Sequence, residues 1–194
     1  MRLRIIEIIS VLLALSACSV SPKSNIYLLK AIEPVQAKLV AQKPISIYLQ
    51  SVNFPDYLDR PQMVLRKDSM TLDVEQFQRW GEPLNISFER VFRGNLERRL
   101  APAKVLSKKI FSAMAFDYQL AIDVSRFDTD AQQQAILQLN WVILNSSGDK
   151  ILFSSQEVII VPMKADNFQA RVEAQSVAVA ILADKVAVQL RGIE

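Results

Sequence analysis

Residues 116–127, FDYQLAIDVSRF, are the stretch of sequence that decides the fold. Apolar side chains from Phe116 through Leu120 to Val124 alternate with polar or small ones, beginning with Asp117. This period of two predicts a strand with one face on a core and the other face in water. A sheet that is solvated on one face is typical of antiparallel pairing.

The segments that follow repeat this pattern. Alternate positions from Ala135 to Ile143 are apolar, and residues 145–149, NSSGD, have the composition of a turn. Residues 150–161 then have the character of a further strand. Together with residues 116–127, these segments predict a three-stranded meander.

A first helix is predicted to begin at Glu82-Pro83, because proline is tolerated in the first turn. Apolar residues recur at helical spacing from Leu84 to Leu100, and Pro102 limits the helix. One face of this helix is therefore expected to pack on the core.

A second, longer helix is predicted to run to about Arg191, with Asp166 as its N-cap and Gln169 reaching back. One apolar stripe along it starts at Phe168 and ends at Leu190. A second stripe consists of Val177, Ala178, Ile181 and Val188. A helix with two stripes either lies between layers or offers one stripe to a partner.

Shorter strands are predicted earlier in the chain. They cover residues 25–29, 45–49, 62–66 and 71–77, and residues 30–44 are interpreted as a linker that contains two prolines. The order of elements predicts a single α+β domain over residues 25–194. Its sheet is expected to be mainly antiparallel, with the two main helices packed on one face.

The amino terminus predicts a lipoprotein. Residues 1–17 form a signal peptide, with a positive start and an apolar run too short to span a membrane. The run ends in LSAC, which resembles the lipobox of bacterial lipoproteins, so Cys18 is expected to carry fatty acyl chains such as palmitate. Residues 18–24 then serve as a tether, and Ser19 favours the outer membrane. The alternative is an incidental cysteine after an ordinary secretory leader.

The composition excludes several kinds of chemistry. The 194 residues include no histidine and only four glycines, which excludes imidazole catalysis, histidine-ligated zinc and phosphate-binding glycine loops. The net charge of +3 comes from interspersed acids and bases, without the basic stripe of nucleic-acid binders. We expect no cofactor, no metal and no enzymatic activity. A hydrolase that uses carboxylates alone is the enzymatic alternative, but Glu82, Asp117, Asp123 and Glu157 are better interpreted as solvated surface.

Two motifs carry a family resemblance. Residues 54–64, FPDYLDRPQMV, are followed by residues 77–84, FQRWGEPL. Together they resemble the PqiC/YmbA family of ABC-transport auxiliary lipoproteins, and Gly81 stands where that family usually has alanine. The resemblance implies an outer-membrane lipoprotein that docks a periplasm-spanning MCE-domain protein and acts as a homo-oligomer. It would not be the motor of such a system, because the sequence has no nucleotide site. Such systems move lipids or other hydrophobic molecules between membranes.

The motifs also supply the candidate partner-binding residues. These are Tyr57, Leu58, Asp59, Arg60, Pro61 and Trp80. Tyrosine and arginine in a proline-bounded loop are favoured in protein-contact hot spots. The alternative is structural: Asp59 and Arg60 pair with neighbours, Pro61 fixes the turn and Trp80 fills the core. A structural or pilotin-like role in another envelope machine is the functional alternative.

Overall fold

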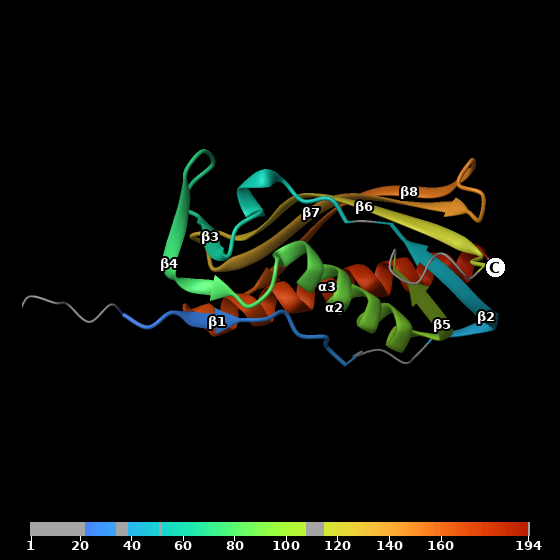
Figure 1. The fold of residues 1–194 in the computed structure, drawn as a ribbon, viewed down its shortest axis with the longest axis horizontal. Coiled ribbons are helices and arrows are strands. Elements are labelled where there is room, and N and C mark those ends of the chain that lie inside the picture. The colour runs from blue at the N-terminus through green and yellow to red at the C-terminus, as the bar shows by residue number, and fades with distance from the viewer. Residues whose placement is uncertain (1–21, 34–38, 51, 108–114, 194) are drawn as a thin grey trace, which may run out of the picture.

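The computed structural model describes residues 22–33, 39–50, 52–107 and 115–193. The predicted signal peptide, Cys18 and the first part of the tether lie outside these residues. The described chain forms, in order, β1 Asn25–Tyr27, β2 Leu39–Leu49, the short 3-10 helix η1 Asp56–Leu58, β3 Gln62–Arg66, β4 Leu72–Trp80, α2 Leu84–Arg99, β5 Leu100–Leu106, β6 Tyr118–Thr129, β7 Gln134–Asn145, β8 Ile151–Pro162 and α3 Phe168–Ile193 (Figure 1).

The strands of the described chain form one eight-stranded mixed sheet. Antiparallel pairs join β3 to β4, β6 to β7 and β7 to β8. Parallel pairs join β1 to β4, β2 to β5, β2 to β6 and β3 to β6. The prediction of a mainly antiparallel sheet is therefore wrong. Turn signals identify strands that pair with their sequence neighbours, whereas the parallel pairs join segments far apart in the sequence.

The meander β6–β8 follows the alternation of its sequence. Strands β6 and β7 pair from Tyr118 opposite Asn145 to Thr129 opposite Ala135. Strand β8 pairs with the other edge of β7. The inward residues are almost fully buried, including Leu120, Ile122, Leu137, Leu139 and Ile143. Burial of these side chains is the main source of stability in this part of the molecule.

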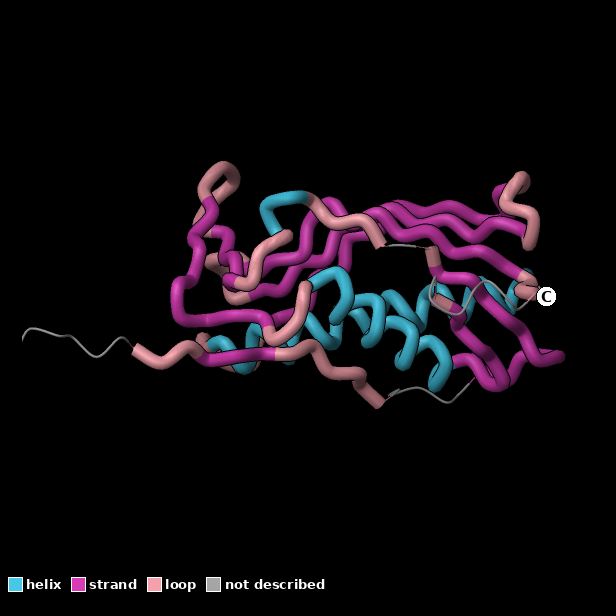
Figure 2. Tube along the Cα trace, viewed as in Figure 1, coloured by secondary structure: helices cyan, strands magenta, loops and turns pink. Residues whose placement is uncertain are grey.

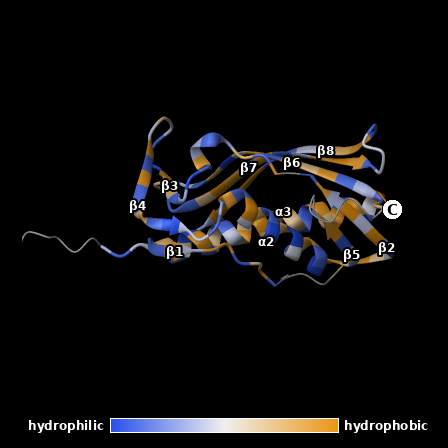
Figure 3. Cartoon of the chain, viewed as in Figure 1, coloured by the Kyte–Doolittle hydropathy of each residue, from blue (hydrophilic) through white to orange (hydrophobic). Residues whose placement is uncertain are grey.

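The two helices lie side by side beneath this meander (Figures 1 and 2). Helix α3 packs on β7, β8 and α2, and α2 also contacts β5. Figure 3 shows hydrophobic residues along β2, β5 and β7, which enclose the same core. No helix within the described part of the chain combines the length and the apolar composition needed to cross a membrane.

Two predicted boundaries need correction. Residues 30–44 are not a linker throughout, because β2 begins at Leu39 and includes Pro44. The register of β2 with β5 shifts between Val40 and Ile45, so Pro44 lies at an irregularity where its missing N–H is tolerated. At the start of α3, Asn167 Oδ1 rather than Asp166 accepts the first-turn N–H of Ala170, at 2.8 Å.

The predicted second stripe of α3 divides between core and surface. Ala178 is fully buried and Val177 is half-buried, whereas Ile181 and Val188 are exposed. The first stripe, which includes Val179 and Leu182, is buried against the sheet and α2. The helix therefore contributes most of its apolar surface to the core of the monomer.

Candidate partner-binding site

The first motif fills a gap along one edge of β6. Strand β2 pairs with the beginning of that edge, at Tyr118–Leu120, and β3 pairs with its end, at Thr129. Between them the chain continues beside β6, where Asn53 N–H donates to the carbonyl of Ile122 at 3.1 Å. The carbonyl of Asn53 accepts from Val124 N–H at 2.9 Å. The loop that follows is therefore aligned by the sheet.

Three side chains then anchor this loop to the body of the protein. The Phe54 ring meets Phe88 of α2 edge-on, with centroids 5.3 Å apart, and meets Phe127 of β6 at 6.1 Å. Leu58, in η1, is buried in the core. The turn is closed by Leu58 N–H donating to the carbonyl of Pro55 at 2.9 Å. These contacts hold η1 in one position.

Tyr57 is the third anchor, and it contacts a buried carboxylate. Its hydroxyl donates to Asp128 Oδ2 at 3.4 Å, and Asp128 is 0% exposed. Arg66 Nε donates to the same oxygen at 3.0 Å, and Arg126 Nε donates to Oδ1 at 2.7 Å. Two guanidinium groups therefore compensate one buried charge. Burial and the charge of Asp128 raise the pKa of Tyr57 above its usual value.

The second motif meets the first at the end of β4. Trp80 N–H donates to the carbonyl of Pro61 at 2.7 Å, and Gln62 lies in register with Arg79. The Trp80 side chain is 7% exposed and belongs to the core. Gly81 N–H donates to the carbonyl of Tyr27 at 2.8 Å, which joins this corner to β1. The two motifs thus form one continuous surface.

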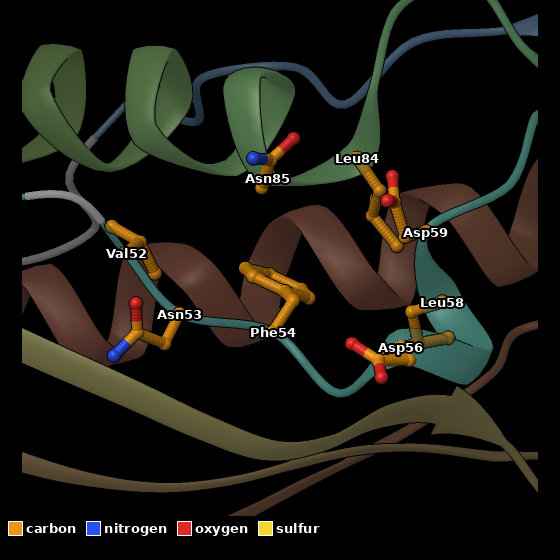
Figure 4. Close-up of a pocket in the computed structure, with 8 residues that line it drawn as sticks. All are labelled: Val52, Asn53, Phe54, Asp56, Leu58, Asp59, Leu84 and Asn85. Atoms are coloured by element: carbon orange, nitrogen blue, oxygen red, sulfur yellow. The ribbon is translucent and has the colours of Figure 1, made fainter.

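Two cavities open on this surface. One has a volume of about 320 Å³ and is lined by Asp59, Arg60, Pro61, Trp80, Gly81, Glu82 and Pro83. The other has a volume of about 390 Å³ and lies between η1 and the start of α2 (Figure 4). It is lined by Val52, Asn53, Phe54, Asp56, Leu58, Asp59, Leu84 and Asn85. Asp59 borders both cavities, so they form a pair on either side of one loop.

The wall at the start of α2 is fixed by an ion pair. Glu82 Oε1 accepts from Arg90 Nε at 3.1 Å and from Arg90 Nη2 at 2.6 Å. The hydrogen bond from Arg90 lowers the pKa of the Glu82 carboxyl below its usual value. Arg90 Nη2 also donates to the carbonyl of Leu29 at 3.3 Å. The Arg90 side chain thus links α2 to Glu82, which precedes the helix, and to Leu29, which follows β1.

The structure places the candidate residues in three environments. Asp59, Arg60 and Pro61 are exposed at the rim of the cavities. Trp80 is largely buried and lines the smaller cavity. Leu58 lines the larger cavity, whereas Tyr57 points toward β6 and is an anchor. Whether any of them binds a partner stays a prediction.

Further residues that were not among the predicted partner-binding residues also shape this site. Gly81 and Pro83 stand within the second motif, so the signal for them was present. Asp128 and Arg66 had no such signal, because a charged pair on β6 and β3 becomes recognisable only when the strands are paired. Asp128 lies near the end of β6, whose other acid, Asp123, is exposed.

Comparison with known families identifies the chain. Residues 27–187 match the model of the ABC-type transport auxiliary lipoprotein component family. The chain belongs to this family. The match covers both motifs and extends from β1 into α3, as the PqiC/YmbA resemblance predicted. The family consists of lipoproteins that serve transport as auxiliary components, and membership supports a membrane-anchored place in the cell envelope.

Solved structures of low sequence identity share the fold. An uncharacterized protein has a TM-score of 0.73 at 15% identity, covering 87% of this chain and 99% of its own. A Xanthomonas campestris protein of the DUF330 family has a TM-score of 0.68 at 20% identity, covering 87% and 96%. The PelC dodecamer of Paraburkholderia phytofirmans gives only 0.45 at 12% identity, covering 82% and 92%, and carries no argument about assembly here. No curated protein matches the chain.

Proposed function

We propose that this chain is an outer-membrane-anchored periplasmic lipoprotein that docks a periplasm-spanning MCE-domain protein in a system for intermembrane transport of lipids or other hydrophobic molecules. The observation that carries the proposal is the meeting of the two motifs at one pair of surface cavities. Membership in the auxiliary lipoprotein family supports a role in transport. Cys18 is the proposed site of acylation.

The chemistry of the surface suits binding of a protein segment. The smaller cavity has the volume of a small binding pocket, and its lining includes Trp80, Pro61 and Pro83. Arg60 is exposed at the rim, and arginine and tryptophan are both enriched in binding hot spots. We propose that an apolar side chain of the partner enters this cavity and that polar groups of the partner contact Asp59 and Arg60.

The anchors of the loop favour binding without large rearrangement. Phe54, Tyr57 and Leu58 hold the loop on β6 and α2, and Trp80 N–H holds Pro61. A surface that is already ordered loses little conformational freedom on binding, which leaves more of the contact energy for affinity. We propose that the protein acts by this contact and not by catalysis.

Affinity capture from gently solubilised envelopes tests the proposal. Wild type is expected to recover an MCE-domain protein, and Arg60→Glu is expected to recover at least about tenfold less, as for loss of a binding hot spot. Lys150→Glu is the matched control, because Lys150 is an exposed cation in the β7–β8 turn, away from both motifs. Recovery of a different envelope machine, with no MCE protein, would overturn the proposal in favour of the pilotin-like alternative.

A second arm tests the anchor. Cys18→Ala is expected to leave the membrane fraction, because the described domain is then held by no acyl chain. Retention of this variant in the membrane would contradict acylation at Cys18 as the anchor.

A homo-oligomer is part of the same proposal, by the family resemblance. Strand β8 pairs only with β7 among the described strands, so one long edge of the sheet is open. Val158 and Ile160 are exposed on this strand. An open edge with apolar side chains is suited to contact between copies. Native mass spectrometry of the purified acylated protein is expected to show a single assembly above the monomer.

A further inference from the structure

We propose that the end of the domain that carries β1 and β4 rests directly on the lipid bilayer, with a patch formed by Ile26, Leu28 and Phe77 in contact with lipid. This inference rests on the anchoring at Cys18 in the proposed function and goes beyond it. An anchor alone leaves the orientation of the domain open. The patch and its position relative to the tether determine which face meets the membrane.

The patch, named here the tether-end patch, is built from neighbouring strands. Ile26 is 70% exposed and Leu28 is 53% exposed, and Phe77 is exposed on β4. Ile26 lies in register with Arg79, two residues from Phe77, so the side chains of Ile26 and Phe77 emerge on the same face of the paired strands. A Cβ atom added at Gly81 would lie 3.0 Å from Ile26 Cγ2 and 3.1 Å from Leu28 Cδ2. Ile26 and Leu28 therefore converge over Gly81.

The tip of the β3–β4 hairpin extends the same end of the molecule. Strand β4 lies at this end, with the hairpin tip at one of its ends and β1 beside the other (Figure 1). Met70, in the tip, is 91% exposed. Its backbone is held by Asp68 Oδ1, which accepts from Met70 N–H at 2.9 Å and from Thr71 N–H at 2.8 Å. The tip is thus an ordered turn that presents an apolar side chain to its surroundings.

The length of chain before the patch points to the bilayer as the occupant. Seven residues lie between Cys18 and Ile26, so eight steps of about 3.3 Å give a reach of about 26 Å. The described chain enters the domain at this end (Figure 1). A tether this short keeps the patch at high effective concentration beside the membrane, so even a weakly apolar surface is held against lipid. A patch at the far end of the domain would not be held close to the membrane by the tether.

Charges of both signs lie beside the patch, because Asp73 and Glu75 are on the same face of β4 as Phe77. Lys23 precedes β1 in the tether, and Arg79 lies in register with Ile26; both are exposed. The two cations are the groups that suit an anionic lipid surface, since lysine and arginine beside apolar side chains are typical of segments in the headgroup region. Lys67 adds a further exposed cation near the hairpin tip.

Site-specific photocrosslinking to lipid tests this orientation. The full-length acylated protein, with a benzophenone amino acid at position 77 or position 70, is reconstituted in vesicles of phosphatidylethanolamine and phosphatidylglycerol. The control carries the same group at position 151, because Ile151 is 61% exposed beside the β7–β8 turn, at the other end of the molecule (Figure 1). Mass spectrometry is expected to find about tenfold more lipid adduct at 77 and 70 than at 151, as for side chains placed in the headgroup region.

The outcomes separate this inference from the proposed function. Flotation of the same vesicles reports whether the acyl anchor holds the protein. Protein that floats but gives equal adduct at positions 77 and 151, or crosslinks at 77 to a second copy of the chain, overturns the orientation alone. Acylated protein that does not float overturns the anchor and this inference with it.

Discussion

The meander β6–β8 and the motif region, residues 52–62 together with 79–84, are held by different kinds of contact. The meander buries many equivalent apolar side chains, such as Leu137 and Leu139, so its stability is distributed. The motif region depends on a few specific contacts between distant segments, among them Tyr57 with Asp128 and Trp80 with Pro61. The comparison teaches that one region supplies the stability and that the other positions a surface.

The largest effect is expected in the meander. Leu137→Ala removes a fully buried side chain from β7 and is expected to lower the free energy of unfolding by about 2–5 kcal/mol. Urea denaturation measures it. Asn140→Ala, at an exposed position of the same strand, is the control and is expected to change stability by less than about 0.5 kcal/mol. Equal losses of unfolding free energy at positions 137 and 140 would contradict the claim that the stability of the meander comes from the buried face of its strands.

A smaller loss of stability, with a local signature, is expected at Asp128. Asp128→Ala leaves Arg66 and Arg126 without their carboxylate and is expected to cost about 3 kcal/mol, at the low end for a broken buried pair because both arginines keep contact with water. Amide hydrogen exchange is expected to accelerate in η1 more than in β7.

Asp123→Ala is the matched control for this change, because Asp123 is an exposed acid of the same strand. It is expected to leave both stability and exchange in η1 close to wild type. If Asp128→Ala accelerated exchange uniformly across the domain, the loop would not be specifically held by that carboxylate.

A still smaller effect on the free energy of unfolding is expected from Glu82, and this effect depends on pH. The pKa of Glu82 is lowered in the folded state by the hydrogen bond from Arg90, so its contribution is present above its ordinary pKa of 4.5 and is lost as pH falls through the lower folded value. Glu82→Gln removes this contribution, by about 0.5 kcal/mol or less because the pair is partly exposed. The difference between variant and wild type, measured by urea denaturation, is expected to shrink as pH falls below 4.5. A difference that grows on acidification would contradict the assignment.

The smallest effect on stability is expected at Gly81. The added Cβ meets Ile26 Cγ2 at 3.0 Å, Leu28 Cδ2 at 3.1 Å and Leu28 Cγ at 3.3 Å, and these exposed side chains can move by a few tenths of an ångström. Gly81→Ala is expected to change the unfolding free energy by no more than about 0.5 kcal/mol. A thermal shift of many degrees would show that this corner is more tightly packed than the contacts indicate.

The same contrast explains how much of the fold was predictable. The strands of the meander and both helices follow from local periodicity, since Leu120 and Ile122 or Leu84 and Phe88 are spaced as their elements require. The parallel pairs of β1, β2 and β3 do not follow from it, because no local pattern tells which distant strand lies alongside. The extent of β2 was not predictable for the same reason. A proline at position 44 is tolerated in this strand only because the register of β2 with β5 is irregular there.

The candidate site was predictable in part. The motif residues were identified by family resemblance, and the fold brings Asp59, Arg60, Pro61 and Trp80 around one cavity. The burial of Tyr57 against Asp128 was not predictable, because it depends on the pairing of β3 with the end of β6. Tyr57 stays a predicted partner contact, and the structure adds that its hydroxyl donates a hydrogen bond to Asp128 and so anchors the loop.

Photocrosslinking through Arg60 in intact cells tests the central claim most directly. With a photoreactive residue at position 60, the account predicts a covalent adduct that contains an MCE-domain protein, and no such adduct with the same residue at position 150. An adduct with an unrelated envelope protein at position 60, or equal capture of the MCE protein from both positions, would contradict the claim that the joined motifs form the docking surface.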